Sequence, residues 1–173
     1  MRKPATTQTE KAFAAYVYAG KTGILAPVSV HAGQSGLFDG TAFRLIQDAS
    51  GSPVVVTPPV VILVADQMKQ MGLDSGLYEG RLRAIVETQA DDEQAAEDLH
   101  SARVEAVRDW LEDFTTVAAA MNQPATGPDT RVVKDFTVSA LVYQDERPYV
   151  KERSLYTELS YYVFVCPQDP VTG

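Results

Sequence analysis

The stretch "LYEGRLRAIVETQADDEQAAEDLHSARVEAVRDWLED", residues 77–113, changes its hydropathy period once, and this change decides the fold class. Over residues 77–89 apolar and polar side chains alternate, with Leu82, Ala84 and Val86 on one face, as in a β-strand with one wetter side. From about residue 91 the apolar residues recur at helical spacing and gather on one wide stripe. A strand followed directly by a long amphipathic helix predicts a domain that mixes both kinds of structure.

Shorter patterns on either side predict the remaining elements. Residues 8–19 are typical of a short helix with Thr9 as its N-cap, and residues 58–66 form an apolar run of strand length. Residues 131–143 and 154–166 are rich in β-branched and aromatic side chains and predict two further strands. The expected fold is therefore α+β: a mainly antiparallel sheet with one long helix packed on a face, plus a short N-terminal helix.

The length of 173 residues suits a single domain over residues 1–173. Residues 24–59 are rich in Gly, Pro and Ser and predict loops with one or two short strands. No apolar run reaches the length of a membrane span, and no apolar segment follows the basic residues at the start, so we expect a cytosolic protein without a signal peptide. The lone Cys166 is expected in the core.

The formal charge of −8 is concentrated in one segment. Residues 91–114 hold nine acids and two arginines, which gives this segment a net charge of −7. An acidic chain lacks the broad basic surface with which proteins bind nucleic acid. The acids can cap a helix, cover a solvated face, or meet something charged, and the sequence leaves these alternatives open.

The sequence contains no arrangement of residues that is typical of a catalytic or cofactor site. His31 and His100 lie in no motif with metal-ligand spacing, and His100 is expected on the surface of the helix. Asp91, Asp92 and Glu93 could bind a divalent cation, although capping of the helix explains them more simply. We therefore expect a protein that is not an enzyme and needs no cofactor, with a small metal-binding or ligand-binding domain as the alternative from another class.

Two segments carry a resemblance to a known family. The segment 77–113, with Thr88-Gln89 ending the strand, an acidic helix start and His100 early in the helix, is the first. The second is "VSALVYQDERPYVKERSLYTELSYYVFVCPQD", residues 138–169. Together they resemble the tail terminator (tail completion) proteins and related neck proteins of long-tailed bacteriophages. The likeness covers about residues 77–169. Arg103 departs from it, because an aliphatic residue is expected at that helix position.

The resemblance implies a structural virion protein that forms a ring, usually of six copies. Such a ring ends the growth of the tail tube and joins it to the head connector, while DNA passes through the channel without specific binding. It implies assembly in the cytoplasm of the host bacterium and a final place in the tail or neck of the virion. Another head–tail neck or adaptor protein remains the nearest alternative.

Two groups of residues are candidates for contacts in such a ring. The charged segment 144–153 is expected to be a loop or an extended hairpin tip that contacts the adjacent ring, or else an ordinary solvated tip. Arg103, in the apolar stripe of the helix, is expected to face a carboxylate or a neighbouring subunit. A second group of acids is expected to face a channel or a charged neighbour. The first group comprises Arg103, Asp145, Glu146, Arg147, Tyr149, Lys151 and Arg153, and the second Asp91, Asp92, Glu93, Glu97 and Asp98.

Overall fold

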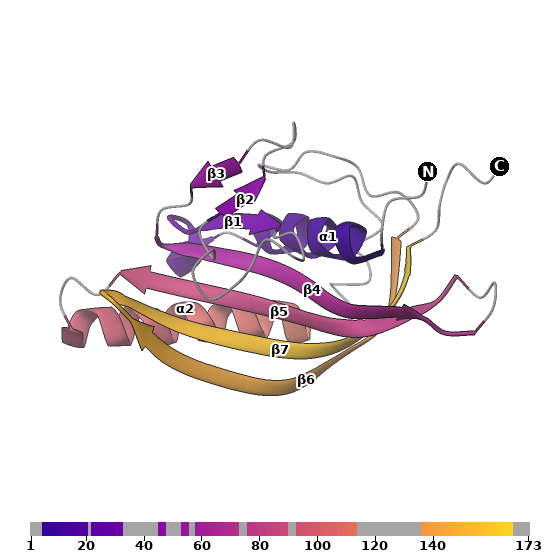
Figure 1. Cartoon of the computed structure of the whole chain (residues 1–173). Helices are drawn as coiled ribbons and strands as arrows, with labels where there is room; N and C mark the ends of the chain where they lie inside the picture. Colours follow the sequence, from indigo (N-terminus) through magenta and orange to yellow (C-terminus); the bar gives the residue numbers. More distant parts are fainter. Residues whose placement is uncertain are drawn as a thin grey trace.

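The computed structural model places a five-stranded sheet at the centre of the fold (Figure 1). The structure describes residues 5–20, 22–32, 45–47, 53–55, 58–72, 76–89, 93–113 and 136–167. Across the sheet the order is β1-β4-β5-β7-β6. The strands are β1 (Ser29–Ala32), β4 (Val60–Gln70), β5 (Tyr78–Gln89), β6 (Phe136–Lys151) and β7 (Ser154–Pro167).

The sheet is mixed, which corrects the prediction of a mainly antiparallel sheet. Three neighbouring pairs are antiparallel: β4 with β5, β5 with β7, and β6 with β7. The first and third pairs are joined by short connections, which favour antiparallel pairing. However, β1 lies parallel to β4, with Ser29 opposite Val60. This pairing was missed because β1 has only four residues and lies in the Gly/Pro/Ser-rich segment, where no alternation can be recognised.

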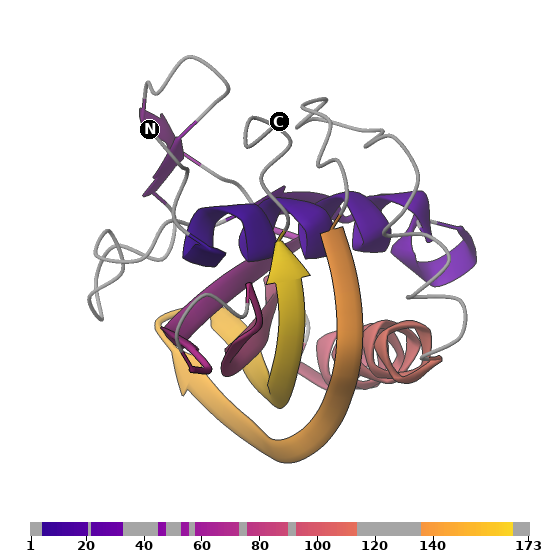
Figure 2. The same cartoon turned by 90° about the vertical axis from the view of Figure 1, so that its right-hand side faces the viewer.

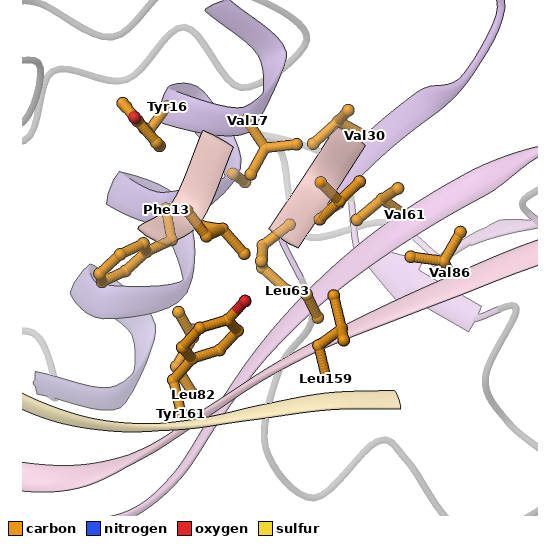
Figure 3. Packing of buried hydrophobic residues seen from close by; sticks show 14 of the residues in the cluster. Phe13, Tyr16, Val17, Val30, Val61, Leu63, Leu82, Val86, Leu159 and Tyr161 are labelled. Carbon is orange, nitrogen blue, oxygen red and sulfur yellow. The ribbon is translucent and has the colours of Figure 1, made fainter. Parts of the chain in front are cut away.

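Helices α1 (Ala5–Ala19) and α2 (Glu93–Glu112) pack on one face of the sheet, which we call the helix face. Figure 3 shows Phe13 and Val17 of α1 against Leu63 of β4, with Tyr161 reaching up from β7. Each such large apolar side chain contributes about 1.5–3 kcal/mol when it is fully buried. The prediction of a long helix on a sheet face is thus confirmed. In contrast, Thr9 lies buried within α1 and is not its N-cap.

The two helices contact each other through Tyr16 of α1 and Trp110 of α2. Their rings stack with centroids 4.9 Å apart. The Tyr16 hydroxyl donates to the Trp110 carbonyl oxygen at 2.7 Å, and Trp110 Nε1 donates to the Tyr16 carbonyl oxygen at 2.9 Å. The close approach needs Gly20, because a Cβ atom there would lie 2.6 Å from Trp110. This contact ties the start of the chain to the end of α2.

The opposite face of the sheet carries a second, smaller apolar cluster. Val60, Ile62 and Val64 of β4 lie beside Ile85 of β5, and Tyr156 of β7 closes the group. None of the described helical residues belongs to this cluster. β5 therefore contributes apolar side chains to both faces of the sheet. Leu82, Ala84 and Val86 point toward the helices, as predicted.

The segment 24–59 contains more regular structure than expected. It holds β1 and, in its described parts, a second small antiparallel sheet of β2 (Leu45–Gln47) and β3 (Pro53–Val55). A short 3-10 helix, η1 (Gly23–Leu25), overlaps its start. Among the described residues, no helix has the length and apolar character that crossing a membrane requires.

Candidate assembly surface

The segment 144–153, predicted as a loop or hairpin tip, is for the most part a strand. Residues 144–151 belong to β6 and pair with β7 down to Lys151 opposite Ser154, so only Glu152 and Arg153 form the turn. Pro148 is tolerated because β6 is the edge strand of the described sheet, and no further strand among the described residues requires its missing N–H group. The charged residues are therefore presented by a continuous hairpin that Figure 2 shows sweeping in a wide arc around the outside of the sheet.

The register of β6 divides the candidate residues between the two faces, since residues opposite one another on paired strands share a face. Asp145, Arg147 and Tyr149 lie opposite Ser160, Glu158 and Tyr156, and hence on the face opposite to the helices. Glu146 lies on the helix face, where its carboxylate is 3.7 Å from the guanidinium group of Arg108 on α2. The hairpin thus offers charge on both sides.

A network of ion pairs supports the hairpin on the face opposite to the helices. Arg83 of β5 contacts Asp66 of β4 at 2.9 Å and Glu158 of β7 at 3.2 Å. Arg81 adds a contact to Glu158 at 3.8 Å and donates to the Ser160 hydroxyl at 3.0 Å. These side chains are only partly exposed, so the network holds three neighbouring strands in register. The sequence showed the alternating charges of β5 but not their partners on other strands.

Arg147 stands next to this network but stays exposed. It lies opposite Glu158 in the register of β6 and β7, and the structure records no ion pair between Arg147 and a described carboxylate. Lys151, Glu152 and Arg153 are likewise exposed at the turn. Arg147 is therefore an exposed cation on a strand whose backbone is fixed by its pairing with β7.

Tyr149 is held more firmly than a surface contact residue would be. Its ring stacks on that of Tyr156 with centroids 4.9 Å apart, and burial raises the pKa of Tyr149 to about 12. The Tyr156 hydroxyl in turn donates to Glu87 Oε1 at 3.0 Å. Tyr149 therefore anchors the end of β6 to the sheet.

The start of α2 and the turn between β6 and β7 lie at the same end of the molecule. Gln89, the last residue of β5, pairs with Ser154, the first residue of β7, and α2 begins four residues after Gln89. Figure 1 shows the start of α2 beside the turn between β6 and β7. Glu97 and Asp98 are exposed on the first turns of α2. Asp91, Asp92 and the side chain of Glu93 lie outside the described residues.

Arg103 and His100 belong to a polar cluster beneath α2. His100 is only 8% exposed, which corrects the prediction of a surface histidine. Its Nδ1 lies 2.9 Å from Thr88 Oγ1 on β5 and its Nε2 lies 2.8 Å from Thr157 Oγ1 on β7. Burial, and then the nearby charge of Arg103, lower the pKa of His100 to about 4. His100 is thus a neutral bridge between α2 and two strands.

Arg103 is 7% exposed, in agreement with its place in the apolar stripe. Its Nη1 donates to Thr88 Oγ1 at 3.3 Å, while its buried Nε has no hydrogen-bond partner. No described carboxylate lies within ion-pair distance of it, so the expected acidic partner is not found in this part of the chain. Burial lowers the pKa of Arg103.

Within the described ranges, no three His, Cys, Asp or Glu side chains come together as metal ligands. The predicted alternative of a cation at Asp91, Asp92 and Glu93 lies outside those ranges. No protein-family model matches the sequence, and no curated protein is significantly similar to it.

Proposed function

We propose that this chain is a structural virion protein of a long-tailed bacteriophage: a tail terminator that assembles into a ring, usually of six copies. The ring closes the tail tube, joins it to the head connector and leaves a channel through which DNA passes. The protein performs no bond-making step and needs no cofactor. The basis is the resemblance of residues 77–113 and 138–169 to that family.

The structural observation that carries the proposal best is the exposed charged hairpin on a fixed sheet. Asp145, Glu146, Arg147, Lys151 and Arg153 are exposed, whereas most residues of the paired strand β7 are buried. Recognition residues on a rigid scaffold lose little conformational entropy when a partner binds. In the proposed ring, Arg147 and Lys151 contact the adjacent ring of the neck.

The acids of α2 fit the same role in a different way. The exposed acids of the helix are Glu97, Asp98, Glu105, Asp109 and Glu112, and the exposed Asp113 follows directly after it. In the proposed ring, carboxylates near the start of α2 face the channel or a charged neighbour. Toward DNA they would repel phosphates, so that the duplex slides without being held.

Charge reversal at the hairpin tests the proposed contact. We expect the double variant Arg147→Glu, Lys151→Glu to fold normally and to block the joining of tails to heads, counted as free tails and free heads in electron micrographs. Lys69→Glu is the control for charge reversal elsewhere on the surface: Lys69 is exposed on β4, pairs with Glu79 at 3.1 Å and lies away from the turn between β6 and β7. Normal yields of joined particles from the double variant would rule out this contact.

A terminator and a head–tail adaptor differ in what they do to the tail tube alone. A terminator binds the end of a growing tube and stops it, whereas an adaptor leaves tube length unchanged. The purified chain is therefore added to the cognate tail-tube protein during polymerisation, and tube lengths are measured by electron microscopy. Unchanged lengths with normal head–tail joining would favour the adaptor.

A further inference from the structure

The outer edge of β6 contains one stretch that is open to another strand. Beyond β6 the sheet has no further strand among the described residues, so one row of its backbone groups has no strand partner there. Register shifts between Val138 and Ala140 and between Tyr143 and Asp145 enclose the regular residues 140–143. This stretch, "ALVY", has no charge and no proline, and Val142 is 53% exposed. We call residues 140–143 the open edge.

The rest of the exposed strand is protected against strand addition. Residues 145–151 carry Asp145, Glu146, Arg147 and Lys151, together with Pro148, which lacks a backbone donor. Charges, proline and bulges are the devices by which natural proteins keep edge strands from pairing. Charges and proline are dense from residue 145 onward and absent from residues 140–143, and the two register shifts lie just outside this stretch. The open edge is therefore the regular, uncharged part of β6.

We propose that residues 140–143 pair antiparallel with the same residues of a second copy of this chain, so that two sheets join edge to edge. The partner is a copy because the open edge is uncharged and apolar, and a copy presents the same neutral surface at the same spacing. The opposite sheet edge is unsuitable, since β1 has four residues and its Val30 is buried. The inference does not rest on the proposed ring, because it concerns the chain alone in solution.

The sheet geometry limits this pair to registers that centre on a residue, and the proposed register centres on Val142, the most exposed residue of the open edge. Residues that lie opposite one another in an antiparallel pair point to the same face of the sheet, whereas neighbours along one strand point to opposite faces. In a pair of identical strands related by a twofold axis, one residue must therefore lie opposite its own copy. Centring on Val142 sets Val142 against its own copy and Leu141 against Tyr143 of the partner on both sides. These are apolar pairs, and each such cross-strand pair contributes roughly 0.2–1 kcal/mol.

The same register keeps like charges apart. With about 3.3 Å per residue, the two Arg147 side chains are separated by ten residues, or roughly 33 Å, far beyond the Debye length at physiological salt. Each copy still has a formal charge of −8, so the two copies repel one another as whole molecules. Added salt screens this repulsion and should therefore strengthen the dimer.

Two valines on β6 provide a matched test, since Val142 and Val150 are both exposed, at 53% and 69%. Sedimentation of the full chain over a wide concentration range should give a reversible monomer–dimer equilibrium. Val142→Lys should shift it to monomer at least tenfold, and Val150→Lys, which adds the same charge, should leave it within twofold of wild type. A chain that is monomeric throughout, or a dimer that Val142→Lys leaves intact or salt weakens, would overturn the proposal.

Cross-linking tests the register without relying on a disruptive substitution. In a Cys166→Ser background, Val142→Cys should be joined into dimers by a short bis-maleimide. Val150→Cys should not be joined, because its copies lie sixteen residues apart along the pair, or roughly 50 Å. Equal cross-linking of the two variants, or none at Val142→Cys, would contradict the pairing. Because these measurements use no tail protein, they can succeed even if the proposed tail function fails.

Discussion

Acid should weaken the fold through His100. The neutral ring bridges Thr88 and Thr157 under α2, and burial together with the charge of Arg103 lowers its pKa from 6.5 to about 4. A histidine whose pKa is lowered by folding binds its proton more tightly in the unfolded chain. Its contribution is thus fully present above pH 6.5 and is lost as the pH falls from 6.5 toward 4.

The size of the effect follows from the pKa difference. A shift of this size corresponds to about 3.4 kcal/mol when the pH is well below 4, and to about 2 kcal/mol between neutral pH and pH 5. Other groups also titrate in this range, so the informative quantity is the difference between wild type and His100→Gln. The variant keeps an amide that can reach the threonine hydroxyls but carries no titrating group.

Urea unfolding at pH 7.5 and pH 5 measures this difference. We expect the wild type to lose about 2 kcal/mol more than His100→Gln between the two pH values. His31→Gln is the control, because it removes the other histidine and keeps His100; it should retain the wild-type loss. If wild type and His100→Gln lose the same stability, then His100 is not the buried neutral bridge described above.

Substitutions at three further positions test the packing and the turn between β6 and β7. Gly20→Ala should lower the free energy of unfolding by about 1–3 kcal/mol, because its Cβ atom would lie 2.6 Å from Trp110. The same substitution should cost less in a Trp110→Leu background, and equal costs in both backgrounds would refute the contact. Arg103→Met should leave stability unchanged or raise it by about 1 kcal/mol, while Arg103→Ala should lower it, because a buried cation without an acidic partner gains little from its charge. A large loss in Arg103→Met by thermal unfolding would indicate a strong charge partner. Glu152 has a φ of 56°, a backbone conformation that asparagine tolerates and that β-branched residues disfavour. Glu152→Asn should therefore stabilise the turn by about 0.5–1 kcal/mol, and Glu152→Val should destabilise it. The reverse order of melting temperatures would contradict the assigned turn geometry.

Patterns that repeat over many residues were predictable from the sequence. The alternation of β5 and the helical spacing of α2 predicted both elements, since every buried position adds to the same signal. The start of α2 was predicted within a few residues, but the helix ends at Glu112, earlier than the predicted end near residue 122. The α+β class followed from their order. Four-residue β1 offers no such repetition, and its parallel partner is about thirty residues away in sequence, so the mixed character of the sheet could not be foreseen.

Residues whose environment depends on distant partners were harder to predict. His100 was expected on the surface because histidine is polar. In the structure it is buried, and the hydroxyl groups of Thr88 and Thr157 lie within hydrogen-bond distance of its two ring nitrogens. Residues 144–153 were predicted as a loop or an extended hairpin tip, and the structure has the second, a hairpin arm that is paired down to Lys151. An edge strand needs few buried residues and tolerates Pro148, so its sequence carries no strong strand pattern. For the same reason the open edge could be recognised only from the sheet order.

The proposal that this chain acts by assembly is tested most directly by electron microscopy of cognate tail tubes polymerised with and without it. We expect shorter tubes that carry ring-shaped density at one end, in proportion to the amount of chain added. Tubes of unchanged length with bare ends, at every ratio of chain to tube protein, would contradict the proposed terminator.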